Sequence, residues 1–464
     1  MNLEELGVLV ETHVSRVVLT DDRAYKMKKA VTLPFVDQGT LARRKRLCEE
    51  EVRLNAELAP GVYRGVVPLV RNPEGTLRFG GEGEIVEWAV EMERLPDDGM
   101  FDRLPRAELQ AALPELAEKL RRFYAHAPRA EEEGSPASVR RRVRTVLDVA
   151  EQHLDPAYAA VLRPHLERRL DALGDLFARR AREGFVVEGH GDLHTANLCR
   201  TARGVVAYDR LEFDRFLRCG DIAFDLAFLV MSLETSGQAD LVPDLLASFE
   251  DPDLDRLVAF YKLQRALVRA NVSVFRGLDP APFDRYAVQQ ALPTWGVLLC
   301  GLPATGKSTR ARALGGTVVR SDAVRKQLCG IDPDEHWQGG FDEGPYDPNV
   351  TAQVYEAVAA QAAATPRVVV DAQLGTRAQR AQLIAALGDR PWVFVHLHEP
   401  DEVIRARLAQ RATEGDISDA DWEVYGIARD RFEPPDEIDP ARVVPADPDA
   451  ITRRLARQSV DRRA

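Results

Sequence analysis

One run of residues in the sequence matches a phosphate-binding pattern in full. It consists of Gly301, Leu302, Pro303, Ala304, Thr305, Gly306, Lys307 and Ser308, followed by Thr309. An apolar run (WGVLLC) precedes it and a helical stretch (STRARAL) follows it, as the pattern G-x-x-x-x-G-K-[ST] requires. Glycines let backbone N–H groups approach phosphates, the lysine reaches the β and γ oxygens, and the Ser308 hydroxyl ligates Mg²⁺. The sequence therefore predicts a P-loop, or Walker A motif, that binds ATP.

Three further residues lie where a phosphoryl-transfer site needs charge. Asp322 follows the predicted strand 317–320, so its carboxylate can accept the proton of a substrate hydroxyl. Arg325, three residues on, can hold an anionic group of the substrate. Asp371 ends the predicted strand 367–371 and can hold Mg²⁺ directly or through water. The alternative for Asp371 is a structural carboxylate that caps a turn.

Arginines recur on the predicted helix DEVIRARLAQRAT. Arg407 and Arg411 are four residues apart and therefore share a face, as a clamp on the transferred phosphoryl group requires. A solvated charged face is the alternative. We expect Arg411 to be the clamp.

The segments GLPATGKST, RSDAVRK, VVVDAQ and RLAQR resemble P-loop kinases related to polynucleotide 5′-kinases, zeta toxins and gluconate kinases. The resemblance covers about residues 296–464. It implies that Asp322 is the general base, Arg325 a substrate contact and Arg411 the lid arginine. Such enzymes build their acceptor site in the region of residues 331–350. The aromatic residues there, which either line that site or pack the loop, are Trp337, Phe341 and Tyr346.

A second set of catalytic residue types lies in the first half of the chain. The stretch HGDLHTAN places Asp192 and Asn197 at the spacing of a kinase catalytic loop. Asp192 would orient and deprotonate the acceptor hydroxyl, while Asn197 would ligate Mg²⁺. Asp209 follows a short predicted strand, where a second metal-binding carboxylate is needed. We expect His190 and His194 to orient the loop through hydrogen bonds.

Upstream residues can hold the nucleotide phosphates. Lys26 and Lys28 lie on one face of the predicted strand AYKMK, because strand side chains alternate with a period of two. We choose Lys26 as the phosphate-binding lysine, with Lys28 as the alternative. Its expected ion-pair partner is Glu51 on the predicted helix CEEEVRLN, with Glu49 and Glu50 as alternatives.

This half resembles the aminoglycoside phosphotransferase-like kinases, a branch of the protein-kinase-like fold, over about residues 8–275. The whole chain resembles bacterial proteins labelled bifunctional aminoglycoside phosphotransferase/ATP-binding protein. One departure is that no G-x-G-x-x-G loop precedes Lys26. We expect the equivalent turn around residues 20–22, with residues 12–15 upstream, so other backbone or hydroxyl groups must cover the phosphates. In addition, DRLE at 209–212 replaces a glycine-containing D-F-G.

These patterns predict an α+β protein-kinase-like bilobal domain followed by an α/β P-loop NTPase domain with a mainly parallel sheet. The expected divisions are a small lobe at 1–95, a large lobe at 96–285, a linker at 286–295 and a P-loop domain at 296–464. The linker is placed in a proline-rich run, RGLDPAPFDRYAVQQALPT. In the small lobe, we expect strands at 14–20, 24–28, 66–70 and 84–92, and a helix over 40–58 capped by Thr40.

Composition narrows the class of protein. The chain has 464 residues, 45% of them hydrophobic and 29% charged, which fits two or three globular domains. Five scattered cysteines without metal-ligand spacing indicate reduced thiols. No run is apolar enough to span a membrane and the start lacks a basic leader, so we expect a cytoplasmic protein with no membrane partner.

Net charge bears on the partners. A formal charge of −12 disfavours broad attraction to nucleic acid. We therefore expect two sites for ATP and Mg²⁺ that phosphorylate hydroxyls of small molecules. One alternative is a nucleic-acid 5′-end kinase in the C-terminal half, and another is a non-catalytic N-terminal domain that regulates the P-loop kinase. The sequence indicates neither the acceptors nor the oligomeric state.

Overall fold

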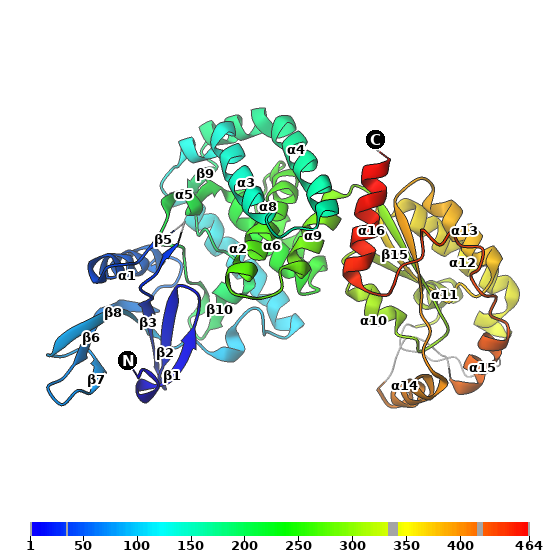
Figure 1. Cartoon of the computed structure of the whole chain (residues 1–464), viewed down its shortest axis with the longest axis horizontal. Helices are drawn as coiled ribbons and strands as arrows, with labels where there is room; N and C mark the ends of the chain where they lie inside the picture. The colour runs from blue at the N-terminus through cyan, green and yellow to red at the C-terminus, as the bar shows by residue number, and fades with distance from the viewer. Residues whose placement is uncertain (1, 34–35, 333–341, 415–420, 463–464) are drawn as a thin grey trace. The chain divides into compact units, whose positions relative to one another are not determined.

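The chain divides into two compact units. The computed structural model describes residues 2–33, 36–332, 342–414 and 421–462, with only the backbone at 411–414 (Figure 1). The first unit comprises Met1–Gln152 and Leu166–Pro280, and the second comprises His153–His165 and Ala281–Ala464.

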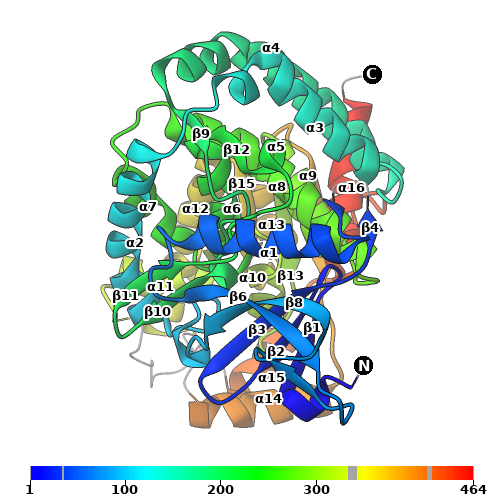
Figure 2. The same ribbon diagram turned by 90° about the vertical axis from the view of Figure 1, so that its left-hand side faces the viewer.

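The first unit begins with an antiparallel sheet in the order β1-β2-β3-β8-β6-β7. Its strands are β1 (Val8–Glu11), β2 (Ser15–Leu19), β3 (Arg23–Lys28), β6 (Tyr63–Arg71), β7 (Leu77–Phe79) and β8 (Glu84–Glu93). A short hairpin of β4 (Thr32–Leu33) and β5 (Val36–Asp37) precedes α1 (Leu41–Asn55), which lies across the sheet (Figure 2). Ala24 of β3, Cys48 of α1 and Val90 of β8 form a shared core. This packing fixes α1 against the strand that carries Lys26.

Local signals predict most of these elements. Thr40 caps α1, since its Oγ1 accepts a hydrogen bond from Arg43 N at 3.3 Å. Strand β1 was not expected, because VLVE is short and its residues are mostly exposed. Residues 20–22 connect β2 to β3, and residues 12–14 form the turn between the first two strands, β1 and β2.

Helices and two small two-stranded sheets make up the rest of the first unit. The helices are α2 (Arg106–His126), α3 (Pro136–Ala150), α4 (Pro156–Glu183), which begins in the second unit, α5 (Arg215–Arg218), α6 (Ile222–Thr235), α7 (Val242–Ala247) and α8 (Leu254–Phe275). The small sheets pair β9 (Val186–Glu188) with β12 (Cys219–Asp221), and β10 (Leu198–Thr201) with β11 (Gly204–Ala207). The segment HGDLHTAN therefore links β9 to β10. Helix α6 is apolar on nearly every face and lies in the core, which gives that segment a rigid support.

The second unit is a parallel α/β domain. Its sheet has the order β14-β15-β13-β16, built from β13 (Trp295–Cys300), β14 (Thr317–Arg320), β15 (Arg367–Asp371) and β16 (Trp392–His396). Every residue of β13 is buried, as expected for a central strand covered on both faces. The helices that follow are α10 (Lys307–Arg312), α11 (Ser321–Cys329), α12 (Pro348–Ala364), α13 (Arg377–Leu387), α14 (Asp401–Glu414), α15 (Trp422–Asp430) and α16 (Pro448–Asp461), and helices flank the sheet on both faces (Figure 1).

Part of the segment expected to be a linker is helical. Residues Ala281–Ala291 form α9, which packs against α16 through a hydrogen bond from Gln289 Nε2 to Thr452 Oγ1 at 3.0 Å. Pro282 stands in the first turn, where a proline costs no hydrogen bond and does not break a helix. The start of α4 belongs to the same unit, since Arg453 Nε lies 2.6 Å from Asp155 Oδ2.

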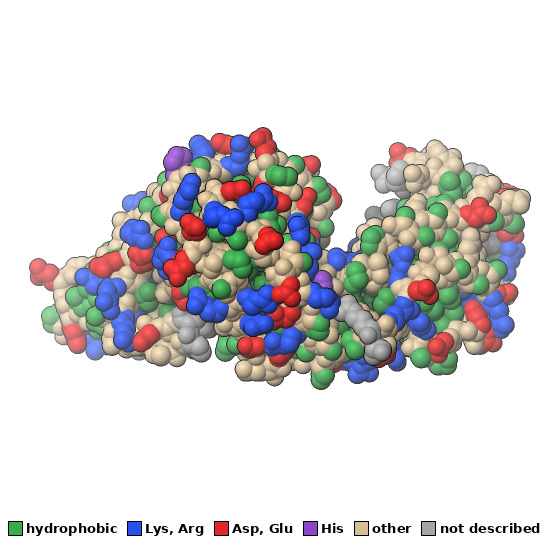
Figure 3. All heavy atoms as spheres, turned by 90° about the horizontal axis from the view of Figure 1, so that it is seen from above, with side chains coloured by type: hydrophobic (Ala, Val, Ile, Leu, Met, Phe, Trp, Pro, Cys, Tyr) green, Lys and Arg blue, Asp and Glu red, His purple; other side chains and the backbone are tan. Residues whose placement is uncertain are grey.

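Within the described ranges, no helix is both long and apolar enough to cross a membrane. On the face drawn in Figure 3, side chains of both charge signs are interspersed. Cys48, Cys199, Cys219 and Cys300 are buried thiols and Cys329 is exposed.

Candidate functional site

The first candidate site is built on the loop between β9 and β10. Asn197 Nδ2 donates to Asp192 Oδ2 at 3.0 Å and to the Asp192 carbonyl at 2.9 Å. Asp225, in the first turn of α6, accepts from the backbone N–H groups of His190 (2.5 Å) and Gly191 (2.8 Å). The loop is thus tied internally through Asn197 and externally to the buried helix α6. The structure brings Asp192 and Asn197 together as predicted.

Two histidines orient the Asp192 carboxylate and its backbone. His190 Nδ1 accepts from Asp192 N at 3.2 Å, so its Nε2 donates to Tyr208 O at 3.0 Å. Burial lowers the pKa of His190, which keeps its ring neutral in this tautomer. His194 Nε2 lies 3.5 Å from Asp192 Oδ2. Burial would raise the pKa of Asp192, but His194 outweighs it and the pKa is lowered, so the carboxylate stays ionised.

Asp209 and Lys26 meet across the cleft between the two lobes. Lys26 Nζ forms ion pairs with Asp209 and, at 2.8 Å, with Glu51 Oε1 of α1. Burial would lower the pKa of Lys26, but Asp209 and Glu51 outweigh it and raise the pKa. Asp209 has a φ of 61°, and its N–H donates to Tyr63 Oη at 3.0 Å. Lys26 and Glu51 are therefore paired as expected.

Lys28 makes a second buried pair that sequence reasoning missed. Its ammonium contacts Glu51 Oε2 at 2.5 Å and Glu212 of the DRLE segment. The side chain of Lys28 is 1% exposed against 13% for Lys26, so Lys26 is the lysine that a nucleotide can reach. Burial would raise the pKa of Glu51, but Lys26 and Lys28 lower it to about 2. Burial raises the pKa of Glu212. The signal for this pair was the second acidic residue of DRLE, the segment that stands in place of D-F-G.

The oxygen atoms of this site fit Mg²⁺. With its amide nitrogen bound to Asp192, Asn197 leaves its Oδ1 as the acceptor end, and Asp209 supplies a carboxylate. Such hard oxygen ligands suit Mg²⁺, which protein sites hold through one or two side chains plus substrate phosphates. Among the described residues, no cluster of three or more His, Cys, Asp or Glu side chains has a metal-binding arrangement. Mg²⁺ at this site would therefore have few protein ligands, as expected where substrate phosphates supply the others.

A hydroxyl-stabilised turn takes the place of the glycine-rich loop. Thr12 Oγ1 accepts from the N–H groups of Val14 (3.3 Å) and Ser15 (2.9 Å) in the turn between β1 and β2. Lys29 N donates to Val14 O at 2.9 Å and ties the turn to the end of β3. This turn can cover phosphates without glycine.

The second candidate site is the loop between β13 and α10. Gly306 has a φ of 85°, and a Cβ there would lie 2.5 Å from Arg310 Nη1. Only glycine fits such a position without strain. Lys307 Nζ donates to Gly301 O (2.8 Å) and Leu302 O (2.9 Å), so its ammonium lies over its own loop, as a phosphate cradle requires. Ser308 is half-buried and Thr309 is exposed on α10.

Two carboxylates lie beside this loop. Burial raises the pKa of Asp322, Lys307 opposes that shift, and the charge of Asp371 adds to it, so the three groups interact. Asp371 ends β15 next to β13, and its buried Oδ2 makes no hydrogen bond, although Arg320 Nε lies 3.4 Å away as an ion pair. A buried carboxylate oxygen of this kind fits a Mg²⁺ ion or a water bound to it.

The arginines of this unit take different positions. Arg325 is buried, and its Nη1 donates to Pro345 O (2.5 Å) and Thr351 Oγ1 (3.1 Å), while the guanidinium lies 4.6 Å from the Tyr346 ring centre. It therefore organises the segment in which an acceptor site was expected. Arg411 lies on α14, but its side chain falls outside the described residues, as do Trp337 and Phe341.

Arg407 of α14 touches the P-loop. Its Nη1 donates to Ala304 O at 3.0 Å, and its Nη2 lies 3.3 Å from Glu399 Oε1. The part of α14 that carries Arg407 is therefore directed at the loop.

Comparison with known proteins decides the family. A model of the phosphotransferase enzyme family matches residues 8–260, more than half of the chain. The chain belongs to the phosphotransferase enzyme family. A second model, described as an AAA domain, matches residues 297–435 of this phosphotransferase. The predicted aminoglycoside phosphotransferase-like domain followed by a P-loop kinase domain with a parallel sheet is thus confirmed. This phosphotransferase is an ATP-dependent kinase that acts on hydroxyl groups, and its cofactors are ATP and Mg²⁺.

Relatives of this phosphotransferase include uncharacterized proteins of Mycobacterium tuberculosis and Mycobacterium bovis. Each is 35% identical over 378 residues, which cover 75% of this chain and 74% of the relative. Among solved structures, a gluconokinase from Sinorhizobium meliloti is 20% identical and covers 37% of this chain and 95% of its own, with a TM-score of 0.26. An aminoglycoside phosphotransferase from Streptomyces rimosus is 17% identical and covers 56% and 92%, with a TM-score of 0.33.

Proposed function

We propose that this phosphotransferase has two separate sites for ATP and Mg²⁺, each of which phosphorylates a hydroxyl group of a small molecule. The observation that carries the proposal is the ion-pair chain from Glu51 through Lys26 to Asp209, together with the Asp192–Asn197 pair. The ion-pair chain joins the proposed phosphate-binding cation to the proposed metal-binding carboxylate, and the Asp192–Asn197 pair supplies the proposed base in the same unit.

In the N-terminal site, Asp192 is the general base. It takes the proton of the acceptor hydroxyl as that oxygen bonds to the γ-phosphorus and the bond to the leaving oxygen of ADP breaks. Lys26 holds the nucleotide phosphates, and Glu51 fixes its ammonium at 2.8 Å. Asn197 and Asp209 hold Mg²⁺, which neutralises phosphate charge when it is bound. Thr12 shapes the turn that covers the phosphates.

In the C-terminal site, Asp322 plays the corresponding part. Its raised pKa suits a base that must also bind a proton during transfer. The P-loop and Lys307 hold the phosphates, while Ser308 and Asp371 hold the metal. Arg325 positions the segment around Tyr346, and Arg411 is the lid arginine. The acceptor is a small molecule in both sites, because a net charge of −12 disfavours polyanionic nucleic acid.

The test inactivates one site at a time in the full chain. Lys307→Ala should inactivate the P-loop site and keep the N-terminal site active, whereas Lys26→Met should inactivate the N-terminal site and keep the P-loop site active. With a panel of hydroxylated metabolites and 5′-hydroxyl oligonucleotides, each variant should release ADP in response to a small acceptor. Adding Asp192→Ala to Lys307→Ala should reduce that release by roughly 10²–10⁴-fold. Without acceptor-dependent ADP release by the Lys307→Ala protein, the N-terminal unit would be regulatory instead. Labelling of oligonucleotides by the Lys26→Met protein would assign the P-loop site to nucleic acid.

A further inference from the structure

One face of α8 passes the catalytic loop of the N-terminal site. Arg265 identifies that face, because its Nη1 donates to Gly191 O at 3.0 Å, directly beside Asp192. Arg269 lies four residues further along the helix, one turn on, and therefore shares the face. Arg276, at the end of α8, lies two turns beyond Arg269 on the same side. A row of guanidinium groups thus leads away from the proposed base.

The small lobe contributes two more basic groups to the same space. His13 lies in the turn between β1 and β2, and Lys29 is tied to that turn by its backbone hydrogen bond to Val14 O. Glu11 of β1 is engaged by Arg16 at 2.6 Å and by Lys29 at 3.1 Å.

Electrostatic interactions link these groups to the Asp192 carboxylate. Burial lowers the pKa of His13, and the charges of Arg276 and Lys29 lower it further, while Asp192 opposes them. Burial also lowers the pKa of Arg269, and Asp192 again opposes the shift. Cations from the large lobe and from the small lobe thus act on the same space as the Asp192 carboxylate.

We propose that the acceptor of the N-terminal site carries an anionic group, a carboxylate or a phosphate, which Arg269 binds beside the reacting hydroxyl. The inference rests on the proposed function of that site. Arg276 and Lys29 add positive charge around the anion. Guanidinium groups bind carboxylates and phosphates through paired hydrogen bonds, and partial burial strengthens them. The same charges repel a polycationic acceptor.

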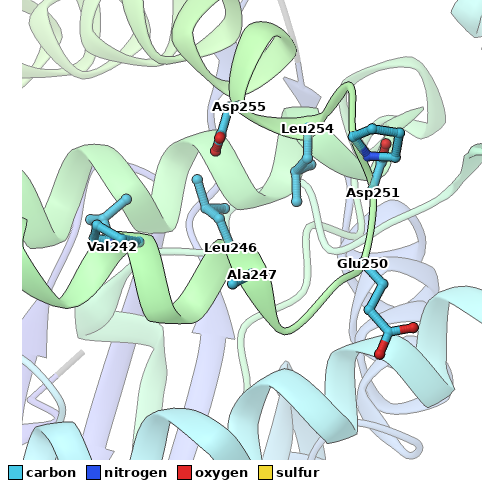
Figure 4. A pocket seen from close by; sticks show the side chains of 9 residues that line it. Val242, Leu246, Ala247, Glu250, Asp251, Leu254 and Asp255 are labelled. Atoms are coloured by element: carbon cyan, nitrogen blue, oxygen red, sulfur yellow. The ribbon is translucent and has the colours of Figure 1, made fainter.

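An acidic hollow elsewhere in the large lobe does not serve a cationic acceptor at this site. It has a volume of 540 Å³ and lies between α7 and the start of α8 (Figure 4). Asp255 lines it, ten residues before Arg265, which is about 15 Å along the helix axis. Its Asp251 is already paired with Arg180 at 2.8 Å.

The test compares neutral, anionic and polycationic acceptors that all carry hydroxyl groups. The Lys307→Ala protein is assayed with glycerol, glycerate and glycerol 3-phosphate, with glucitol and gluconate, and with kanamycin. ADP release should follow the anionic members. Arg269→Gln in the same background should lower kcat/KM for an anionic acceptor by about 10- to 100-fold, with the KM for ATP unchanged. Arg269→Lys should recover part of that loss. Arg256→Gln is the control, because it removes the same charge from an exposed position on the same helix.

A binding titration tests the proposal even when the acceptor is not identified. With both nucleotide sites filled by a non-hydrolysable ATP analogue and Mg²⁺, titration of the full chain with glycerate and inorganic phosphate should show a site that Arg269→Gln weakens and Arg256→Gln does not. Equal binding by wild type and Arg269→Gln, or turnover of kanamycin or glycerol in preference to the anions, would overturn the proposal. Acceptor turnover that survives Asp192→Ala would instead overturn the proposed function of the site.

Discussion

Lys28 and Glu212 form an ion pair in the interior of the N-terminal unit, with side chains 1% and 5% exposed. Lys28 also contacts Glu51 Oε2, while Lys26 contacts Glu51 Oε1. One glutamate of α1 therefore joins two lysines of β3, and the second lysine joins the segment after β11. Lys26, which we propose binds the phosphates, is held by a network that extends beyond its own partner.

Removing one charge from this network should destabilise the unit. Glu212→Gln leaves Lys28 with less compensation in the interior, and we expect a loss of about 1–3 kcal/mol in unfolding free energy. Chemical denaturation followed through the first unit measures it. The matched control is Asp240→Asn, which breaks the exposed pair with Arg106 and should cost under about 1 kcal/mol. The double variant Lys28→Met/Glu212→Leu should be more stable than either single one. Equal losses of unfolding free energy in Glu212→Gln and Asp240→Asn would show that the buried pair contributes no more to stability than the exposed pair.

The two sites should differ in their response to acid. Burial raises the pKa of Asp322, so its ionised, proton-accepting form is lost at a higher pH than that of an ordinary aspartate. The pKa of Asp192 is lowered, so its ionised form survives to lower pH. Acidification should therefore inactivate the P-loop site first. The measurement is the pH dependence of kcat/KM for the Lys26→Met and Lys307→Ala proteins, in which the titration of ATP is common to both. If kcat/KM of the two proteins fell at the same acidic pH, one of the two aspartates would not be the base.

Arg407 should support nucleotide binding by the P-loop. Arg407→Ala removes the hydrogen bond to Ala304 O and the ion pair with Glu399, so we expect the KM for ATP at this site to rise by about 3- to 10-fold. Arg405→Ala is the control on the same helix, since Arg405 is exposed and its guanidinium lies 4.2 Å from the ring of Trp422. Both are measured in the Lys26→Met protein. A rise in the KM for ATP that is the same in both would indicate a general effect on α14.

The turn that replaces the glycine-rich loop should depend on its hydroxyl. Thr12→Val keeps the side-chain shape but removes the acceptor of the two backbone N–H groups. The KM for ATP at the N-terminal site should rise by about 3- to 10-fold, whereas Thr12→Ser should stay close to wild type. ATP titration of the Lys307→Ala protein measures the change. Tight ATP binding by Thr12→Val would place the phosphate cover elsewhere in the small lobe.

Short sequence motifs predicted which residues of each candidate site lie close together. Asp192 and Asn197 are five residues apart on one loop, and Gly306 and Lys307 are adjacent, so spacing alone brings each set together. Period two on β3 placed Lys26 and Lys28 on one face, where both contact Glu51, because strand geometry is local. The fold classes followed from the alternation of elements for the same reason.

Tertiary packing decided what local patterns could not. Lys26 and Lys28 share a strand face, and only the burial of Lys28 against Glu212, 184 residues away in sequence, tells them apart. The exposed strand β1 has no apolar alternation, so only the folded sheet shows that it pairs with β2 and that residues 12–14 form the turn between them. Residues 153–165 join the second unit through Asp155 and Arg453, which are 298 residues apart. Such long-range pairs depend on side chains that only the folded chain brings within reach, since charged residues form similar local patterns whether they are buried or solvated.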